Sequence, residues 1–280
     1  MPTVLSVQSR VAYGHVGNAA SIFPLQLLGV EAWALDTVAF SNHTGHGRWR
    51  GSVVAAGEVA SVFEGIADLG VLPQLDAVLS GYLGAAETGP VLLDIVSRVK
   101  AANPRALYCV DPVIGDVDTG PYVTAGIAEF FRDRALPAAD IATPNRFELE
   151  FLTGRPAGSL AEATAAAEKL RSLGPAVVLV TSLDFLPGRM VMLAAGPDGV
   201  WVVETPRLPV ILNGCGDVTA ALFLGRIVRG ENLPDALAET AAAMHALIET
   251  TARLDRYELA LVAAQRELAA PSHAFAPARI

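Results

Sequence analysis

Short apolar runs, rich in valine and other strand-forming residues, alternate with longer segments of helical character along this chain. Eight such runs occur, at residues 3–7, 30–38, 75–81, 106–112, 140–145, 176–182, 189–195 and 199–204. Strands separated by helices form βαβ units, in which the strands run parallel. The pattern therefore predicts an α/β fold with a mostly parallel sheet. The last two runs flank the turn sequence GPDG and predict a β-hairpin at a sheet edge.

Two helices have clear start signals. Ser159 can cap a helix over residues 159–173, Glu162 stands at the capping-box position, and Gly174 is expected to end the helix. Asn232 is expected to begin a second, longer helix. No internal repeat, low-complexity tract or linker interrupts the chain, so we expect one domain over residues 1–280.

Composition excludes several classes of protein. The net charge is −9, and the chain lacks the clustered Lys and Arg that hold nucleic-acid phosphates. No apolar run reaches the roughly 18 residues of a membrane span, and the start MPTVLSVQSR lacks signal-peptide features. The two lysines, Lys100 and Lys169, do not follow glycine, which excludes a P-loop. Cys109 and Cys215 form no disulfide framework, so we expect a cytoplasmic protein with small-molecule partners.

Polar stretches follow six of the predicted strands. They read SVQSRVAYGHVGN, FSNHTGHGRW, SGYLG, DPVIGD, TPNRFELE and TSLD. Each one alone could be an ordinary loop. Because the ligands of open parallel sheets collect at the carboxyl ends of strands, six polar ends in series favour a ligand site at that edge.

The stretch ILNGCGDVTAALFLGRIVRG places two glycines and an aspartate at the start of an apolar helix. Gly214 and Gly216 allow successive N–H groups to point the same way and form a nest for an anion such as phosphate. Asp217 could be an ordinary acid at a helix start. Beside a bound phosphoryl group, its carboxylate could instead accept the proton of an attacking alcohol. That second interpretation predicts a small-molecule kinase.

A triphosphate donor requires a divalent cation, and hard cations prefer oxygen ligands. Asn145 and Glu148 stand three residues apart at a helix start and therefore share one face. Asp111 and Asp116 could add negative charge. The pattern is consistent with a magnesium site, with Asp111 and Glu148 as ligands, partly through water. The alternative for Glu148 is a plain first-turn acid.

These residues carry a family resemblance. The turn from Gly214 to Asp217 and the motif from Asn145 to Glu148 are similar to those of the ribokinase superfamily. The segments QSRVAYGHVGNAA, FSNHTGHGRW, SGYLG, NPRALYCVDPVIGD and TPNRFELE together resemble the pyridoxal kinases, from about residue 4 to the C-terminal helices. The resemblance implies a three-layer α/β/α sandwich of ribokinase-like fold, ATP with Mg²⁺, and a homodimer.

The resemblance also implies roles for individual residues. The vitamin pocket is expected to include Ser9, Thr44, Gly45, His46 and Tyr82. The nucleotide contacts are expected to be Asp111, Asp116, Tyr122, Thr143, Asn145, Glu148, Thr181, Arg207, Leu208, Pro209 and Val210, of which Asp116 and Tyr122 cover the phosphates. Asp217 is the expected base, and the anion hole is formed by Gly214, Cys215 and Gly216.

The expected function is ATP-dependent phosphorylation of the 5′-hydroxymethyl group of pyridoxal, with pyridoxine and pyridoxamine as further acceptors, in vitamin B6 salvage. One alternative is a hydroxymethylpyrimidine kinase of thiamin metabolism, against which the FSNHTG segment argues. Another is a pyridoxal-phosphate carrier without catalysis, against which Asp217, Asn145 and Glu148 argue.

Cys215 occupies the variable position of the glycine turn. A thiol at a helix N-terminus has a lowered pKa and could add reversibly to an aldehyde, which suggests a covalent contact with pyridoxal. The alternative is a small packing residue.

Overall fold

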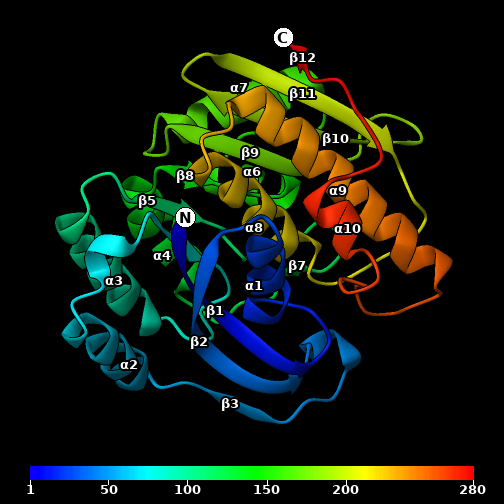
Figure 1. Cartoon of the computed structure of the whole chain (residues 1–280). Helices are drawn as coiled ribbons and strands as arrows, with labels where there is room; N and C mark the ends of the chain where they lie inside the picture. Colours follow the sequence, from blue (N-terminus) through cyan, green and yellow to red (C-terminus); the bar gives the residue numbers. More distant parts are fainter.

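A ten-stranded sheet runs through the middle of the molecule (Figure 1). The computed structural model describes residues 1–280. The order across the sheet is β12 (Ala278–Arg279), β11 (Gly199–Pro206), β10 (Arg189–Gly196), β9 (Val177–Leu183), β8 (Ile141–Ala142), β5 (Leu107–Val110), β4 (Ala77–Ser80), β1 (Thr3–Tyr13), β2 (Glu31–Asn42) and β3 (Gly51–Val53). A separate two-stranded sheet is formed by β6 (Gly115–Asp116) and β7 (Gly120–Pro121).

The centre of the large sheet is parallel and its edges are antiparallel. Strands β2, β1, β4, β5, β8 and β9 pair in parallel. The predicted hairpin is present as β10 and β11, with Gly196 opposite Gly199, and β12 adds a short strand outside it. Strand β1 has β2 on one side and β4 on the other, so the chain reverses its direction of travel across the sheet there. Such switch points are where α/β sheets bind ligands.

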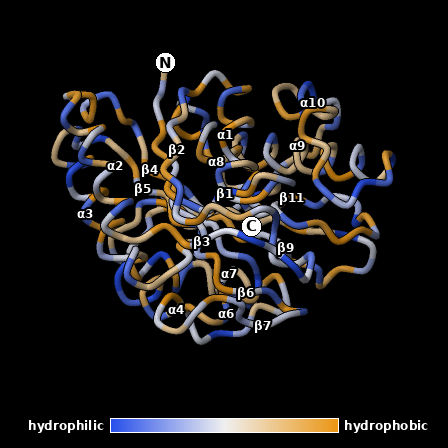
Figure 2. Tube along the Cα trace, turned by 90° about the horizontal axis from the view of Figure 1, so that it is seen from below, coloured by the Kyte–Doolittle hydropathy of each residue, from blue (hydrophilic) through white to orange (hydrophobic).

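Helices cover both faces of the sheet and complete a three-layer α/β/α sandwich (Figure 2). One layer contains α1 (Asn18–Leu27), α8 (Cys215–Val228), α9 (Leu233–Arg253) and α10 (Gln265–Ala269). The other contains α2 (Ala56–Asp68), α3 (Thr88–Ala102), α4 (Ile127–Phe130), the π-helical η3 (Phe131–Ala135), α5 (Leu136–Ala138), α6 (Arg146–Thr153) and α7 (Leu160–Arg171). Two 3₁₀ turns are η1 (Thr44–His46) and η2 (Leu72–Gln74). None of these helices combines the length and hydrophobicity needed to cross a membrane.

Alternation along the buried strands produces two hydrophobic cores, one on each face. In β9, Val178 and Val180 belong to the core under α7, whereas Leu179 belongs to the core under α9. Both faces are covered, which is why the central strands read as continuous apolar runs in the sequence. The predicted α/β class with a mostly parallel sheet is confirmed.

The predicted helix starts are also present. The Ser159 hydroxyl accepts the N–H of Glu162 at the start of α7, and the Asn232 side chain accepts the N–H of Asp235 at the start of α9. Helix α7 ends at Arg171, before the predicted Gly174. A Cβ at Gly174 would lie 2.2 Å from the carbonyl oxygen of Leu136, so close backbone approach accounts for this glycine.

Strands β1 and β2 are longer than their apolar runs predict. They continue to Tyr13 and Asn42 and pair with each other beyond the rest of the sheet. The register between them shifts at Ser9, which therefore lies within β1 at a bulge. The sequence pattern instead predicts that Ser9 follows the strand. Bulges redirect side chains near binding sites. The apolar pattern does not continue into this extension, because it contains polar side chains, so the sequence did not predict it as strand.

Candidate functional site

A cavity of about 490 Å³ opens where the parallel strands end. All six polar stretches contribute to it. Its wall contains Ser9, Val11, Val16, Val38, Phe40, His43, Thr44, Gly45, Tyr82, Asp111, Val113, Asp116, Thr119, Tyr122, Thr143, Asn145, Glu148, Thr181, Ser182, Leu212, Asn213, Gly214, Cys215, Gly216 and Asp217. The predicted residues that lie outside this wall are His46, Arg207, Leu208, Pro209 and Val210.

The glycine turn at the start of α8 needs both of its glycines, for different reasons. Gly214 has φ +84°, and a Cβ there would lie 1.9 Å from the carbonyl oxygen of His15. At Gly216 the nearest atom to a Cβ would be Oδ2 of Asp111, at 3.9 Å. Gly214 therefore shapes the turn, and Gly216 keeps the cavity open in front of the first-turn N–H groups, which have no partner within the helix.

Asp217 is half-buried at the cavity, in the first turn of α8. Burial raises its pKa to about 6, while hydrogen bonds from the N–H of Gly17 and from its own N–H act in the opposite direction. Gly17, with φ +56°, packs against Ser9, where a Cβ would lie 2.1 Å from the carbonyl oxygen. The carboxylate thus sits between the glycine turn and the bulge in β1, mostly ionised at neutral pH.

Asp111 is buried beneath the glycine turn. The Thr143 hydroxyl donates to its Oδ1 (2.9 Å). Burial, and next the negative charge of Asp217, raise the pKa of Asp111 to about 8, and the Thr143 hydrogen bond opposes the shift. A carboxyl group so far from its ordinary pKa is typical of functional sites.

Glu148 is a helix-capping acid that also lies in the cavity wall. It forms a capping box with Asn145, whose side chain accepts the Glu148 N–H (2.9 Å) while Glu148 Oε2 accepts the Asn145 N–H (2.9 Å). Its Oε1 accepts the N–H of Ile114 (2.9 Å). Burial and the charge of Asp111 nevertheless raise its pKa well above the ordinary value. Glu148 is therefore both a helix cap and a buried acid of the cavity wall.

The small β6–β7 sheet brings Asp116 and Tyr122 to the cavity. Asp116 Oδ1 accepts the N–H and the hydroxyl of Thr119 (2.7 and 2.9 Å), which holds the turn between the strands. The Tyr122 N–H donates to the carbonyl of Ile114 (3.0 Å), which ties the turn to the loop over Glu148. The sequence pattern does not predict this sheet, because each strand has only two residues.

His43, and not His46, faces the cavity. The η1 turn separates them: Nδ1 of His43 accepts the N–H of Gly45 (3.1 Å), whereas Nε2 of His46 lies 2.7 Å from Glu258. Burial lowers the pKa of His43, so this imidazole is neutral. His43 caps the turn and His46 ends it, and chain position alone does not indicate which way each ring points.

Glu258 is a further residue that sequence reasoning missed. Its Oε2 accepts the N–H of His15 (3.1 Å), and its Oε1 pairs with His46. A single carboxylate thereby connects the turn of Thr44 and Gly45 to the loop whose carbonyl touches Gly214. No sequence signal marks it, because the two partners are more than 200 residues away.

The segment from Arg207 to Val210 leaves β11 near the end of β9. Arg207 lies 3.4 Å from Asp184, which also pairs with Arg146 (3.5 Å). The cavity wall there is formed instead by Thr181 and by Ser182, whose φ of 58° is unusual for a residue other than glycine. Asn213 was missed too, although it directly precedes the glycine turn.

The prediction of a lowered pKa for Cys215 is wrong. Burial, and next the charge of Asp217, raise the pKa of this thiol to about 12. Desolvation and a neighbouring carboxylate outweigh the favourable helix N-terminus. The thiol is therefore protonated at neutral pH, and the argument for an adduct with an aldehyde loses its chemical basis.

Comparison with known proteins agrees with this geometry. The family described as phosphomethylpyrimidine kinase matches residues 56–261. Pyridoxal kinase PdxY of Rubrobacter xylanophilus is 54% identical over 99% of this chain and 97% of that protein. The PdxY protein of Granulibacter bethesdensis is 49% identical over 97% and 98% of the two chains. The structure of Leishmania donovani pyridoxal kinase in complex with ADP and pyridoxamine superimposes with a TM-score of 0.94 at 28% identity, covering both chains completely. The chain therefore belongs to the phosphomethylpyrimidine kinase family and, within it, to the pyridoxal kinases.

Proposed function

We propose that this protein is an ATP-dependent pyridoxal kinase, which transfers the γ-phosphoryl group of ATP to the 5′-hydroxyl of pyridoxal, with pyridoxine and pyridoxamine as further acceptors. The observation that carries the proposal is the position of Asp217. It lies in one cavity together with the glycine turn, the polar residues around Ser9 and Tyr82, and the acids Asp111 and Glu148. Relatives that are 44–54% identical over nearly their full length are pyridoxal kinases.

Asp217 acts as the general base in this proposal. With a pKa of about 6, it is mostly ionised at neutral pH and still basic enough to take a proton from an alcohol. The oxygen of the acceptor then attacks the γ-phosphorus in line. The N–H groups at the start of α8 stabilise the charge on the phosphoryl oxygens. Ser9, Thr44, Gly45, Tyr82 and His43 surround the vitamin, and His46 supports this wall from outside through Glu258.

The nucleotide is proposed to lie along the remaining wall, which contains Asp111, Asp116, Tyr122, Thr143, Asn145, Glu148 and Thr181. Arg207, Leu208, Pro209 and Val210 remain predicted contacts beyond this wall. The segment that contains them follows β11 directly and leads into the glycine turn. Their contribution therefore requires the segment to approach the nucleotide when it binds.

The donor set of the cavity suits Mg²⁺. Four carboxyl groups line it, those of Asp111, Asp116, Glu148 and Asp217, and no lysine or arginine does. The phosphates of ATP would meet no positively charged side chain in this wall, so a divalent cation is needed to neutralise them. Oδ2 of Asp111 faces the glycine turn, whereas both oxygens of Glu148 already accept N–H groups. We therefore assign Asp111 as the direct ligand and Glu148 as a ligand through water.

The test is a panel of acceptors. Pyridoxal, pyridoxine, pyridoxamine and hydroxymethylpyrimidine are offered with ATP, with and without Mg²⁺, and kcat/KM is measured for each. We expect the B6 vitamers to be preferred and turnover to require the cation. A preference for hydroxymethylpyrimidine would support the thiamin-type kinase that the family description also allows. Binding of pyridoxal phosphate without ATP consumption would support a carrier.

The pKa of Asp217 predicts the acidic limb of the pH profile. The carboxyl group must be ionised to accept a proton, so kcat/KM should fall about tenfold per pH unit below pH 6. The measurement is kcat/KM from pH 4.5 to 8, a range chosen to bracket about pH 6. Pyridoxine serves as a second acceptor, because its ring ionises differently. An acidic limb that moves with the acceptor would assign the titration to the vitamin rather than to Asp217.

Gly216→Ala should separate folding from turnover. A Cβ there would meet no protein atom closer than 3.9 Å, and alanine is more favourable than glycine in a helix, so the unfolding temperature should be unchanged or slightly raised. The added methyl group would project toward the bound phosphate, and we expect kcat to fall about 100-fold. Unchanged kcat in the folded variant would exclude phosphate from this position.

A cytoplasmic location, a homodimer and a role in vitamin B6 salvage complete the proposal. Two free cysteines support a reducing compartment, since neither is in a disulfide. The dimer is supported by the family resemblance, and equilibrium sedimentation of the purified protein tests it.

A further inference from the structure

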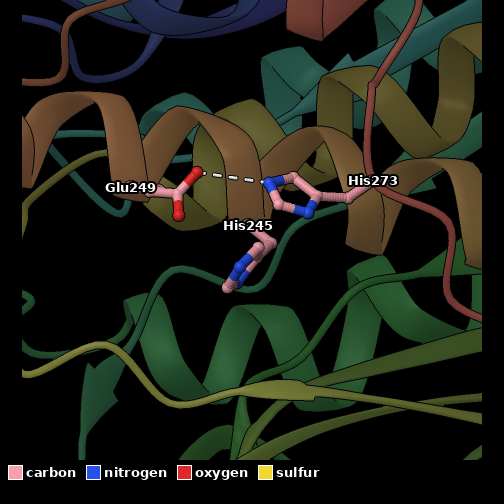
Figure 3. Close-up of side chains that lie close together, drawn as sticks. All are labelled: His245, Glu249 and His273. Carbon is pink, nitrogen blue, oxygen red and sulfur yellow. Dashed lines mark hydrogen bonds and ion pairs between the residues drawn. The ribbon is translucent and has the colours of Figure 1, made fainter.

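Three potential metal ligands gather outside the cavity. His245 and Glu249 stand four residues apart on α9 and therefore share one face of that helix. His273 comes from the segment after α10. One ligand atom from each residue lies within 4.8 Å of the other two. Figure 3 shows Glu249 and His273 joined by a dashed line in front of α9, with the His245 ring beside them.

Their chemistry matches one class of metal. Two imidazoles and a carboxylate are ligands of Zn²⁺ and similar transition-metal ions, whereas Mg²⁺ and Ca²⁺ prefer oxygen alone. Nε2 of His273 lies 3.2 Å from Glu249 Oε2. The rings of His245 and His273 have centroids 4.9 Å apart and pack edge to face at 86°.

His245 is prepared for such a role by its surroundings. It is only 7% exposed, so the side chains packed around it hold its position. The backbone of Pro206 lies beside the ring and offers a carbonyl of the kind to which metal-binding histidines usually donate their other N–H. Phe275 closes one side, stacked on His273 at 11°.

We propose that His245, Glu249 and His273 bind one zinc-class divalent ion, with water completing the coordination, and that the ion fastens the C-terminal segment to α9. Tetrahedral bonds of about 2.1 Å place the ligand atoms about 3.4 Å apart, so ligand atoms now separated by up to 4.8 Å must approach by about 1.4 Å. Glu249 and His273 can rotate, because their side chains are 54% and 34% exposed. The buried His245 provides the fixed ligand.

The segment after His273 gives the ion a structural role. It returns to the sheet as β12, which pairs with Trp201 and Val202 of β11. Arg279 donates to the carbonyl of Asp198 (2.7 Å) and lies over the ring of Trp201. A metal at His273 would add a second attachment point before this strand and so reduce its fraying.

Zinc binding tests the proposal directly. The full chain, without a histidine tag, is titrated with Zn²⁺ against a chromophoric chelator in excess Mg²⁺, and Co²⁺ spectra report the ligand set. The double variant Glu249→Gln/His273→Gln removes two exposed ligands and leaves the core intact; His245→Gln removes the third. Glu239→Gln, on the same helix, is the matched control. The variants do not change the cavity, so any zinc that binds there contributes equally to each titration and does not affect the difference in affinity between them.

We expect one tight ion per chain in the parent and the control, and at least about 100-fold weaker affinity in the double variant. Equal affinity in parent and double variant would overturn the site. Hydrogen exchange of residues 274–280 tests the structural role. Zn²⁺ should slow it in the parent and not in the double variant, and unchanged exchange with zinc bound would overturn the fastening. Neither readout depends on kinase activity.

Discussion

Replacing Asp217 with asparagine is expected to lower kcat for pyridoxal phosphorylation by about 10² to 10⁴, with little change in substrate binding. The amide has nearly the same shape as the carboxylate and cannot accept the proton of the alcohol at neutral pH. The N–H groups of the glycine turn remain in place, so the residual rate reports what electrostatic stabilisation alone achieves. Single-turnover kinetics with Mg²⁺ and ATP give the chemical step, and equilibrium titration gives the pyridoxal affinity.

Asp118→Asn is the matched control for this experiment. The Asp118→Asn variant changes the net charge by the same amount as Asp217→Asn. Asp118 lies close to the cavity, on the exposed turn between β6 and β7, but it is not part of the cavity wall. Its kcat should stay near that of the parent. Undiminished kcat in Asp217→Asn would remove the base from the mechanism, and an equal loss in both variants would point to net charge instead.

Gly214→Ala is expected to lower the free energy of unfolding by about 2–5 kcal/mol. Placing a side chain at φ +84° costs about 1–2 kcal/mol, and overpacking against the carbonyl of His15 adds about 1–3 kcal/mol. Since proteins are stable by only about 5–15 kcal/mol, much of the variant should unfold on mild heating. Urea unfolding followed by circular dichroism measures the loss.

Gly230→Ala is the control that lacks a close contact, so its comparison with Gly214→Ala measures the effect of the contact between Gly214 and His15. Gly230 follows the other end of α8 with φ +89°, and no atom lies within 4 Å of a Cβ there. The free energy of unfolding of Gly230→Ala should fall only by the cost of a side chain at positive φ, about 1–2 kcal/mol. If both variants lost the same stability, the close approach at Gly214 would carry no energetic weight and the turn would be more plastic than its geometry indicates.

The sequence predicted the large sheet well because each long strand carries a complete pattern. All eight apolar runs are strands, and the caps at Ser159 and Asn232 begin helices. Strands β3, β6, β7 and β12 were missed. They contain two or three residues each, too few for periodicity to appear. Such strands depend on the backbone that happens to lie beside them.

The candidate cavity lies at the sheet edge that the sequence predicts, since strand ends and glycine turns are visible in a sequence. The sequence does not show how far burial desolvates an ionisable group, or in which direction a side chain points. The thiol of Cys215 follows a helix start that favours ionisation, yet burial beside Asp217 decides its pKa. His43 and His46 read alike in the sequence, but a 3₁₀ turn directs one ring into the cavity and the other to Glu258. The roles assigned to the individual residues stay predictions until the variants are made.

Both edges of the ten-stranded sheet end in strands of minimal length, β3 at one side and β12 at the other. A long unpaired strand offers a row of free N–H and C=O groups to which another polypeptide can add, which is a common route to aggregation. Here β12 occupies only the first part of β11 and turns away. Shortening the chain before Ala278 would uncover the backbone of Trp201 and Val202, so we expect the shortened chain to aggregate more readily.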